Sequence, residues 1–234
     1  MQFFTAYFLL YIQMCWNENI SLNTFIFTTA ALFFIYYNNT YTQYKIKEFN
    51  NNYMYLFVFI FTSMQLIEYF LWKSINTKNK SMNYIVSVIG WALVRIIQPI
   101  ALLLLFPLKY AFYKKISFGI YFGALLLYVI YKFCYNPIKF VTTVGKNGHL
   151  DWQWLNNTDK VDLLPSALYV VCLFTLFFKF PIIATAIISM FVYSYLIFNT
   201  ERGTMWCFIS NSILLYVVFK ILFILPFKEH SKIC

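Results

Sequence analysis

The feature that most constrains the fold is a succession of apolar runs separated by short polar connections. An α-helix needs about 20 apolar residues to cross a bilayer. The chain is 62% hydrophobic and 11% charged, which is far from the composition of soluble domains. The sequence therefore predicts an all-α polytopic transmembrane helical bundle, a multi-pass membrane protein with a single domain over residues 1–234. The apolar runs cover residues 2–16, 24–37, 53–72, 82–106, 116–134, 164–178, 181–198 and 204–227.

The number of spans follows from the length of these runs. The first two runs are shorter than a full crossing, because a bilayer of ordinary thickness takes about 20 helical residues. They could form a tight helical hairpin, or the first could be a re-entrant segment. We therefore expect eight apolar segments, of which seven are true spans if the first is re-entrant.

The positive charge of the chain suits a membrane surface. The formal net charge is +10, but most Lys and Arg side chains lie between the apolar runs, as Lys73, Lys78 and Lys80 do. Basic residues in such places contact lipid headgroups, so we expect the lipid bilayer, and not nucleic acid, as the partner. The five cysteines form no CxxC pair, and they predict neither a disulfide framework nor a metal site.

The one long connection predicts a β-hairpin inserted at residues 139–155. Two β-favouring runs there flank an Asn147-Gly148 pair, and Asn-Gly between two such runs is a strong signal for a hairpin turn. Alternate residues of a strand point to the same side. We expect one face of the second run, which carries Leu150, Trp152 and Trp154, to lie on the end of the bundle or at the membrane interface.

Alternation of the spans brings unusual residues of several segments to one end of the bundle. With eight spans, the connections at 17–22, 73–81, 135–162 and 199–203 emerge on the same side, which we call the hairpin side. Glu68 and Glu201 lie near this side by the rise of an α-helix. The hairpin residues above them form a candidate lid that consists of His149, Asp151, Trp152 and Trp154.

Glu68 is the residue that most requires an explanation, because it interrupts a long apolar run. An ionisable side chain at the centre of a bilayer costs roughly 2.5 to 3.5 kcal/mol on insertion scales. Gln65, Glu68 and Trp72 are spaced i, i+3, i+7 and share one helical face. We expect this face to point into the bundle, and Glu68 to have Gln65 and a group from another segment as polar neighbours.

A second polar face lies on the run at 82–106. Trp91, Arg95 and Gln98 occupy positions i, i+4 and i+7, and Pro99 follows directly. Arg95 is near the middle of its span, so it should face the interior and have a partner. Glu68 is the obvious candidate for that partner, although by helical rise it lies about 10 Å nearer the hairpin side.

Three functional hypotheses follow from these residues. In the first, a polar intramembrane pocket binds or transports a small ligand or ion, with Glu68 as charge carrier or proton acceptor. In the second, the chain is a membrane-embedded enzyme acting on a lipid or isoprenoid, with Glu68 or Glu201 as general acid or base. In the third, the polar residues only hold the helices together in a structural or interaction protein. The pocket hypothesis involves Gln65, Glu68, Trp72, Trp91, Arg95, Gln98, Glu201, Trp206 and Asn211, and no catalytic residue is assigned.

Lys220 in the last run supports a minor alternative. A lysine in a final span could hold retinal as a Schiff base, as in rhodopsin-like proteins of similar size, and retinal is the only cofactor that the sequence brings into consideration. Gln98 stands where a carboxylate counter-ion would be expected. Lys220 also lies near the opposite interface, where a lysine can extend its amine to the headgroups.

Four short motifs carry a resemblance to a known family. They are Cys15-Trp16-Asn17 with Ser21, Met64-Gln65-x-x-Glu68-x-x-x-Trp72, Gln98-Pro99, and Gly203-Thr204-Met205-Trp206-Cys207. With these motifs the chain resembles an uncharacterised family of multi-spanning membrane proteins in giant DNA viruses and protists. The excess of Lys over Arg and the abundance of Asn, Ile, Tyr and Phe agree with an AT-rich genome. The resemblance implies a viral or protist membrane protein and adds no assigned activity.

Overall fold

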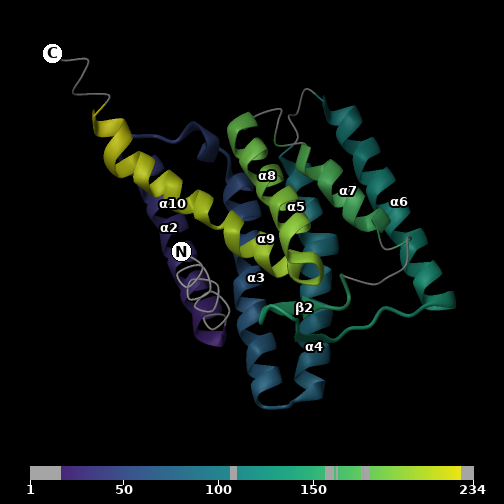
Figure 1. Cartoon of the computed structure of the whole chain (residues 1–234). Helices are drawn as coiled ribbons and strands as arrows, with labels where there is room; N and C mark the ends of the chain where they lie inside the picture. Colours follow the sequence, from purple (N-terminus) through teal and green to yellow (C-terminus); the bar gives the residue numbers. More distant parts are fainter. Residues whose placement is uncertain are drawn as a thin grey trace.

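The computed structural model describes residues 17–105, 110–155, 161, 163–174, 176 and 180–227. This part of the chain folds into a bundle of apolar helices with one small β-hairpin (Figure 1), which confirms the predicted fold class. The predicted run 2–16, with Cys15, lies outside the described residues. The long helices are α2 (Glu18–Tyr41), α3 (Asn52–Asn76), α4 (Lys80–Ala92) continued by η2 (Leu93–Ile97) and α5 (Gln98–Leu104), α6 (Ala111–Tyr135), α8 (Pro181–Phe198), and α9 (Arg202–Ser210) continued by α10 (Ser212–Phe219) and η7 (Lys220–Ile224).

Asparagine side chains fix the start of three of these helices. The Asn17 side chain accepts hydrogen bonds from the backbone N–H groups of Asn19 and Ile20, Asn51 caps α3 in the same way, and Asn79 caps α4. An Asn at the N-cap satisfies backbone donors that the first helical turn leaves free. The polar connections therefore also determine where each apolar helix begins.

Six helices of the described chain are long and apolar enough to cross a membrane. The predicted run 24–37 becomes a full crossing because α2 extends from Glu18 to Tyr41. Within the described residues the predicted span 164–178 holds a shorter helix, because α7 (Leu163–Leu173) has 11 residues and reaches only about 16 Å. Positions 175, 177 and 178 lie outside the described residues. The outward faces carry large apolar side chains such as Phe33, Leu127 and Leu196, which a bilayer would cover.

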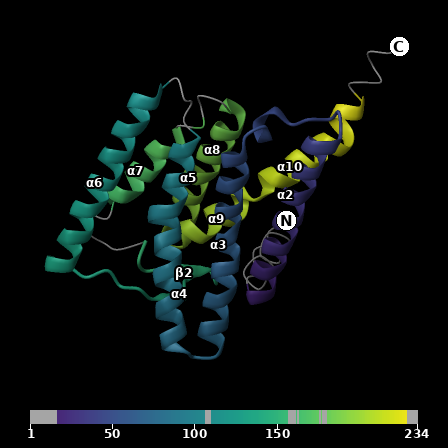
Figure 2. The ribbon, with the colours of Figure 1, turned by 180° about the vertical axis from the view of Figure 1, so that it is seen from behind.

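Hydrogen bonds confirm that the four predicted connections share one side. The Asn76 amide at the end of α3 donates to the Glu18 carboxylate at the start of α2, at 3.2 Å. The backbone N–H of Asn147 in the hairpin donates to the Glu201 carboxylate, at 2.8 Å. Figures 1 and 2 show the α3–α4 connection and the hairpin towards the same end of the bundle, whereas α10 rises obliquely towards the other end.

The hairpin packs against α4 and α9 towards the hairpin side of the bundle. Strands β1 (Thr142–Val144) and β2 (Leu150–Trp152) pair antiparallel, and Gly148 adopts a φ of 80° in the turn, which glycine tolerates. The Asn83 side chain of α4 both accepts from the Thr142 N–H and donates to the Thr142 carbonyl, each at 3.0 Å. The predicted face with Leu150, Trp152 and Trp154 is indeed shared, but all three side chains are buried.

Two glycines in the helices make room for the buried tryptophans. A Cβ atom at Gly90 in α4 would lie 3.4 Å from the Trp154 ring. A Cβ atom at Gly203 in α9 would lie 2.9 Å from the Trp152 ring. The indole rings therefore pack where the helices lack side chains, and the predicted position at the membrane interface stays a prediction.

The helix that carries Arg95 contains a π-helical turn, η2, directly before Pro99. Proline has no N–H, so residue 99 cannot donate to the Arg95 carbonyl as an α-helix requires. The Tyr121 hydroxyl of α6 donates to this carbonyl instead, at 2.9 Å. In a membrane such a side-chain donor is what allows a proline within a helix, and the bond also ties α6 to the centre of the bundle.

Candidate functional site

Six of the nine predicted pocket residues lie in three separate settings. One is the face of α3 with Gln65, Glu68 and Trp72, which we call the polar core. The second is a cavity among η2, β2, α7, α8 and α9, which we call the arginine cavity. The third is the anchor between Glu201 and the hairpin turn. The walls of the arginine cavity are Val94, Arg95, Trp152, Leu155, Ser166, Tyr169, Phe191, Tyr195, Arg202, Gly203, Trp206 and Cys207.

The polar core confirms the predicted orientation of Glu68. Gln65 and Glu68 are completely buried, and Trp72 is 6% exposed. Cys207 of α9 is close enough to the Glu68 carboxylate for an electrostatic interaction, so a second segment contributes a polar neighbour. Within the described chain, neither carboxylate oxygen of Glu68 and neither side-chain polar atom of Gln65 has a hydrogen-bond partner. The polar core is thus a group of buried polar atoms with unmet hydrogen bonds.

The predicted pairing of Glu68 with Arg95 is not formed. The Arg95 side chain is 2% exposed, and its Nη2 donates to the Ser166 hydroxyl of α7 at 3.0 Å. The guanidinium thus has an acceptor on α7, whereas neither Glu68 oxygen has a hydrogen-bond partner in the described chain. The helical offset of about 10 Å between the two residues also separates them. Arg95 belongs to the arginine cavity, and Glu68 does not.

The arginine cavity has a volume of about 60 Å³, which accommodates a few water molecules or part of a small ligand. Arg95 and Arg202 are the only two arginines in the chain, and both contribute to its walls. The Arg202 guanidinium lies 4.7 Å from the centre of the Tyr195 ring, a cation–π arrangement. The Trp206 indole N–H donates to the Ile187 carbonyl at 3.3 Å, which fixes this wall.

Sequence reasoning missed most residues of this cavity, among them Ser166, Tyr169 and Arg202. Arg202 stands next to the predicted Glu201, and the rarity of arginine in this lysine-rich chain was a usable signal. Guanidinium groups bind carboxylates and phosphates with a fork of donors that lysine lacks. Ser166 and Tyr169 carry no such signal, because the sequence of α7 has the pattern of an ordinary apolar run.

Three predicted pocket residues lie elsewhere. Trp91 packs its ring against Phe140, with ring centres 5.9 Å apart. Gln98 accepts a hydrogen bond from the Tyr169 hydroxyl at 2.7 Å. Asn211 lines a second cavity of about 40 Å³ between α3, α8 and α10, and both polar atoms of its side chain lack a partner within the described chain. The single pocket of the sequence hypothesis is therefore divided between separate places.

The hairpin forms a wall of the arginine cavity, not a lid above it. Trp152 and Trp154 stack with ring centres 5.0 Å apart, and Trp152 reaches the cavity. His149 is buried with its ring against Phe198, whereas Asp151 is half-buried. The predicted lid residues thus have different roles, and only Trp152 touches the cavity.

Glu201 anchors the hairpin turn to the bundle. Its side chain is 1% exposed and accepts from the Asn147 N–H. Burial raises the pKa of the Glu201 carboxyl above its usual value, although hydrogen bonds from the backbone of Asn147 and His149 oppose this shift. Burial lowers the pKa of the His149 imidazole. Burial therefore disfavours the charged form of both side chains.

We expect acidification to weaken the contribution of His149 to stability. A lowered pKa in the folded state means that the unfolded chain binds the proton more readily. The stability from the neutral ring is complete above the usual His pKa of about 6.5, and it is lost as the pH falls through the lowered value. The difference in Tm between wild type and His149→Gln should therefore shrink from pH 8 to pH 5. Acidification has the opposite effect on the contribution of Glu201, because its pKa is raised in the folded state. Adding Glu201→Gln to both wild type and His149→Gln therefore separates the effects of the two groups. A Tm difference between wild type and His149→Gln that does not change with pH would contradict the prediction.

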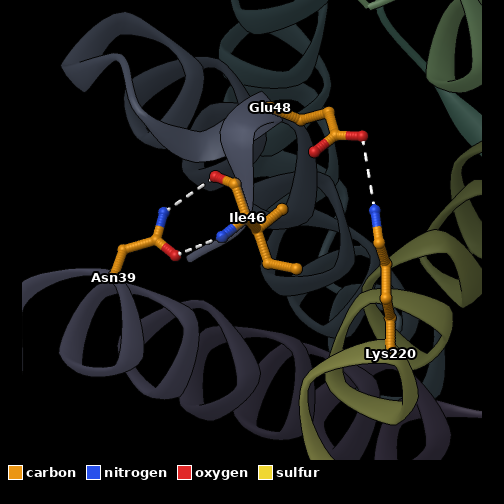
Figure 3. A network of polar contacts seen from close by, with 4 residues as sticks. All are labelled: Asn39, Ile46, Glu48 and Lys220. Carbon is orange, nitrogen blue, oxygen red and sulfur yellow. Dashed lines mark hydrogen bonds and ion pairs between the residues drawn. The ribbon is translucent and has the colours of Figure 1, made fainter. Parts of the chain in front are cut away.

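Lys220 gives no support to the retinal alternative. Its amine lies 3.5 Å from the Glu48 carboxylate, near the connection between α2 and α3 (Figure 3). The Asn39 side chain holds this connection, since it donates to the Ile46 carbonyl and accepts from the Ile46 N–H. Lys220 is partly exposed, and we therefore interpret it as an ion-pair link between η7 and this connection.

The enzyme hypothesis finds no assembled catalytic group. Glu201 is engaged by the hairpin, and Glu68 belongs to the polar core. Within the described ranges, no three His, Cys, Asp or Glu side chains come together in a way that could hold a metal ion. Comparison of the chain with known protein families, with characterised proteins and with solved structures finds no match. Membership in the giant-virus and protist family therefore stays a prediction.

Proposed function

We propose that this membrane protein binds a small anionic ligand, with a carboxylate or phosphate group, in the arginine cavity. The observation that carries the proposal is that both arginines of the chain lie in the walls of one cavity, among aromatic side chains. The described walls contain no carboxylate. Guanidinium groups recognise planar anions by paired hydrogen bonds, and aromatic walls suit an apolar body attached to the anion.

The two arginines have different parts in this proposal. Arg95 is buried and oriented by Ser166, so it provides a fixed positive end to the cavity. Arg202 is half-buried and rests on Tyr195 at the hairpin side. A ligand that enters from this side would meet Arg202 first and would lie between Trp152 and Trp206, the aromatic walls.

Binding of benzoate to the full chain in lipid nanodiscs tests the proposal, with benzyl alcohol as a neutral probe of similar shape. We expect benzoate, but not benzyl alcohol, to raise the Tm, because a ligand that binds only the folded state stabilises it. Arg202→Gln should weaken benzoate binding at least about tenfold, equivalent to about 1.4 kcal/mol.

Lys73→Gln is the matched control, because it removes one positive charge from an exposed position on the same side of the protein. It should leave benzoate binding unchanged. Equal shifts by both probes, or wild-type affinity in Arg202→Gln, would contradict the proposal.

A further inference from the structure

Glu68 has no part in the proposed ligand site, because the side chains of the polar core line neither the arginine cavity nor the second cavity. Its carboxyl group nevertheless has unfavourable surroundings for a charge. It is completely buried in α3, and its oxygens lack hydrogen bonds within the described chain. An ionised carboxylate in such a place loses its hydration without compensation.

We propose that Glu68 is a proton-binding site of the bundle and that it carries its proton at neutral pH. In this step a hydronium ion gives one proton to one carboxylate oxygen: an O–H bond of the hydronium breaks, the O–H bond of a neutral carboxylic acid forms, and water is left. The proposal does not rest on ligand binding in the arginine cavity.

A proton on Glu68 would let the buried side chains of Gln65 and Glu68 form a hydrogen bond with each other. They are three residues apart on one face of α3, a spacing at which helical side chains meet. A protonated carboxyl has one O–H donor that a carboxylate lacks, and the Gln65 amide offers an acceptor oxygen as well as donors. The proton therefore allows both groups to satisfy each other, in a segment where unmet polar groups cost several kcal/mol each in lipid.

Glu68 lies beside a part of the chain that lines both cavities. Cys207, its neighbour on α9, lines the arginine cavity. One turn further along the same chain, Ser210 and Asn211 line the second cavity. Phe61 of α3 belongs to that second cavity and contacts the Trp206 ring, with ring centres 5.4 Å apart. The polar core therefore borders the segment of α9 that separates the two cavities.

A proton, and not a metal cation, is the ligand that this place favours. A cation needs a space with several oxygen ligands around it, whereas neither flanking cavity has Gln65 or Glu68 in its described walls. A proton needs no volume and only one acceptor. Binding of sodium or potassium at Glu68 is accordingly an outcome that would contradict the proposal.

Infrared difference spectroscopy of the full chain in nanodiscs at pH 7 tests this. We expect wild type minus Glu68→Gln to show the carbonyl stretch of one protonated carboxylic acid, shifted downward in protein purified in D₂O. Wild type minus Glu48→Gln should lack this band, because Glu48 is ion-paired with Lys220. Gln65→Leu should shift the frequency of the band, because the acid loses its neighbour.

Absence of the band from the Glu68→Gln difference, or a band that disappears when sodium or potassium is added, would overturn the proposal. If Glu68→Gln does not fold, Glu68→Asp serves in its place. A protonated aspartic acid would move the carbonyl band to a different frequency, whereas an ionised aspartate would give no such band. Loss of benzoate binding with an intact band would instead reject only the proposed ligand function.

Discussion

Replacing Gly203 with valine is expected to be among the most destabilising single changes in this protein. A Cβ atom at this position would lie 2.6 Å from the Leu155 side chain and 2.9 Å from the Trp152 ring. Both neighbours belong to the segment that the hairpin inserts into the bundle, and Trp152 is 2% exposed. Overpacking of a well-packed core costs about 1 to 3 kcal/mol, and valine adds two methyl groups beyond this Cβ.

Gly123→Val is the matched control, because Gly123 is also within a spanning helix but a Cβ atom there would meet nothing within 4 Å. Unfolding in detergent, followed by tryptophan fluorescence, should show a lower midpoint for Gly203→Val and little change for Gly123→Val. Since Trp152 also lines the arginine cavity, Gly203→Val should also change the emission of the folded state. Equal midpoints for the two variants would mean that the hairpin is not packed on α9.

Much of the fold could be predicted because a bilayer imposes a simple rule on the sequence. Backbone groups in lipid must bond within their own helix, so long apolar runs become helices, and short connections force neighbouring helices to alternate in direction. That argument placed Glu18, Asn76, Asn147 and Glu201 on one side, as their hydrogen bonds confirm. It failed for α7, because apolarity alone does not show where a helix ends within a run.

The candidate site was harder to predict, because packing and not periodicity decides which polar residues meet. Burial of Glu68 followed from the cost of a charge in lipid. Its supposed partner Arg95 turns to Ser166, and no spacing within the sequence places α7 beside η2. The hairpin face was correct, but its insertion depends on Gly90 and Gly203, whose missing side chains are meaningful only once the neighbouring helices are placed.

The connection between Gly145 and Glu201 should show the largest coupling between two residues. A Cβ atom at Gly145 would overlap the Glu201 carboxylate, lying 2.6 Å from its Cδ. Gly145→Ala should therefore push Glu201 away from the Asn147 N–H and cost about 1 to 3 kcal/mol. Glu201→Ala removes a buried hydrogen bond to a carboxyl group and should cost about 1.5 to 3 kcal/mol.

The double variant Gly145→Ala/Glu201→Ala should be more stable than the sum of the single losses predicts. Once the Glu201 side chain is removed, the methyl group added at position 145 fits in the space that it left. The steric cost of the collision therefore lowers the stability of Gly145→Ala but not that of the double variant. Neighbouring residues typically show a coupling of about 0.5 to 3 kcal/mol, which unfolding in detergent can resolve. Glu48→Ala combined with Gly145→Ala is the control, because Glu48 pairs with Lys220 at the other end of the bundle and its loss should add independently. Additive losses for Gly145 and Glu201 would mean that the Glu201 carboxylate does not lie against the hairpin turn, and that Glu201 is available for another role at the hairpin side.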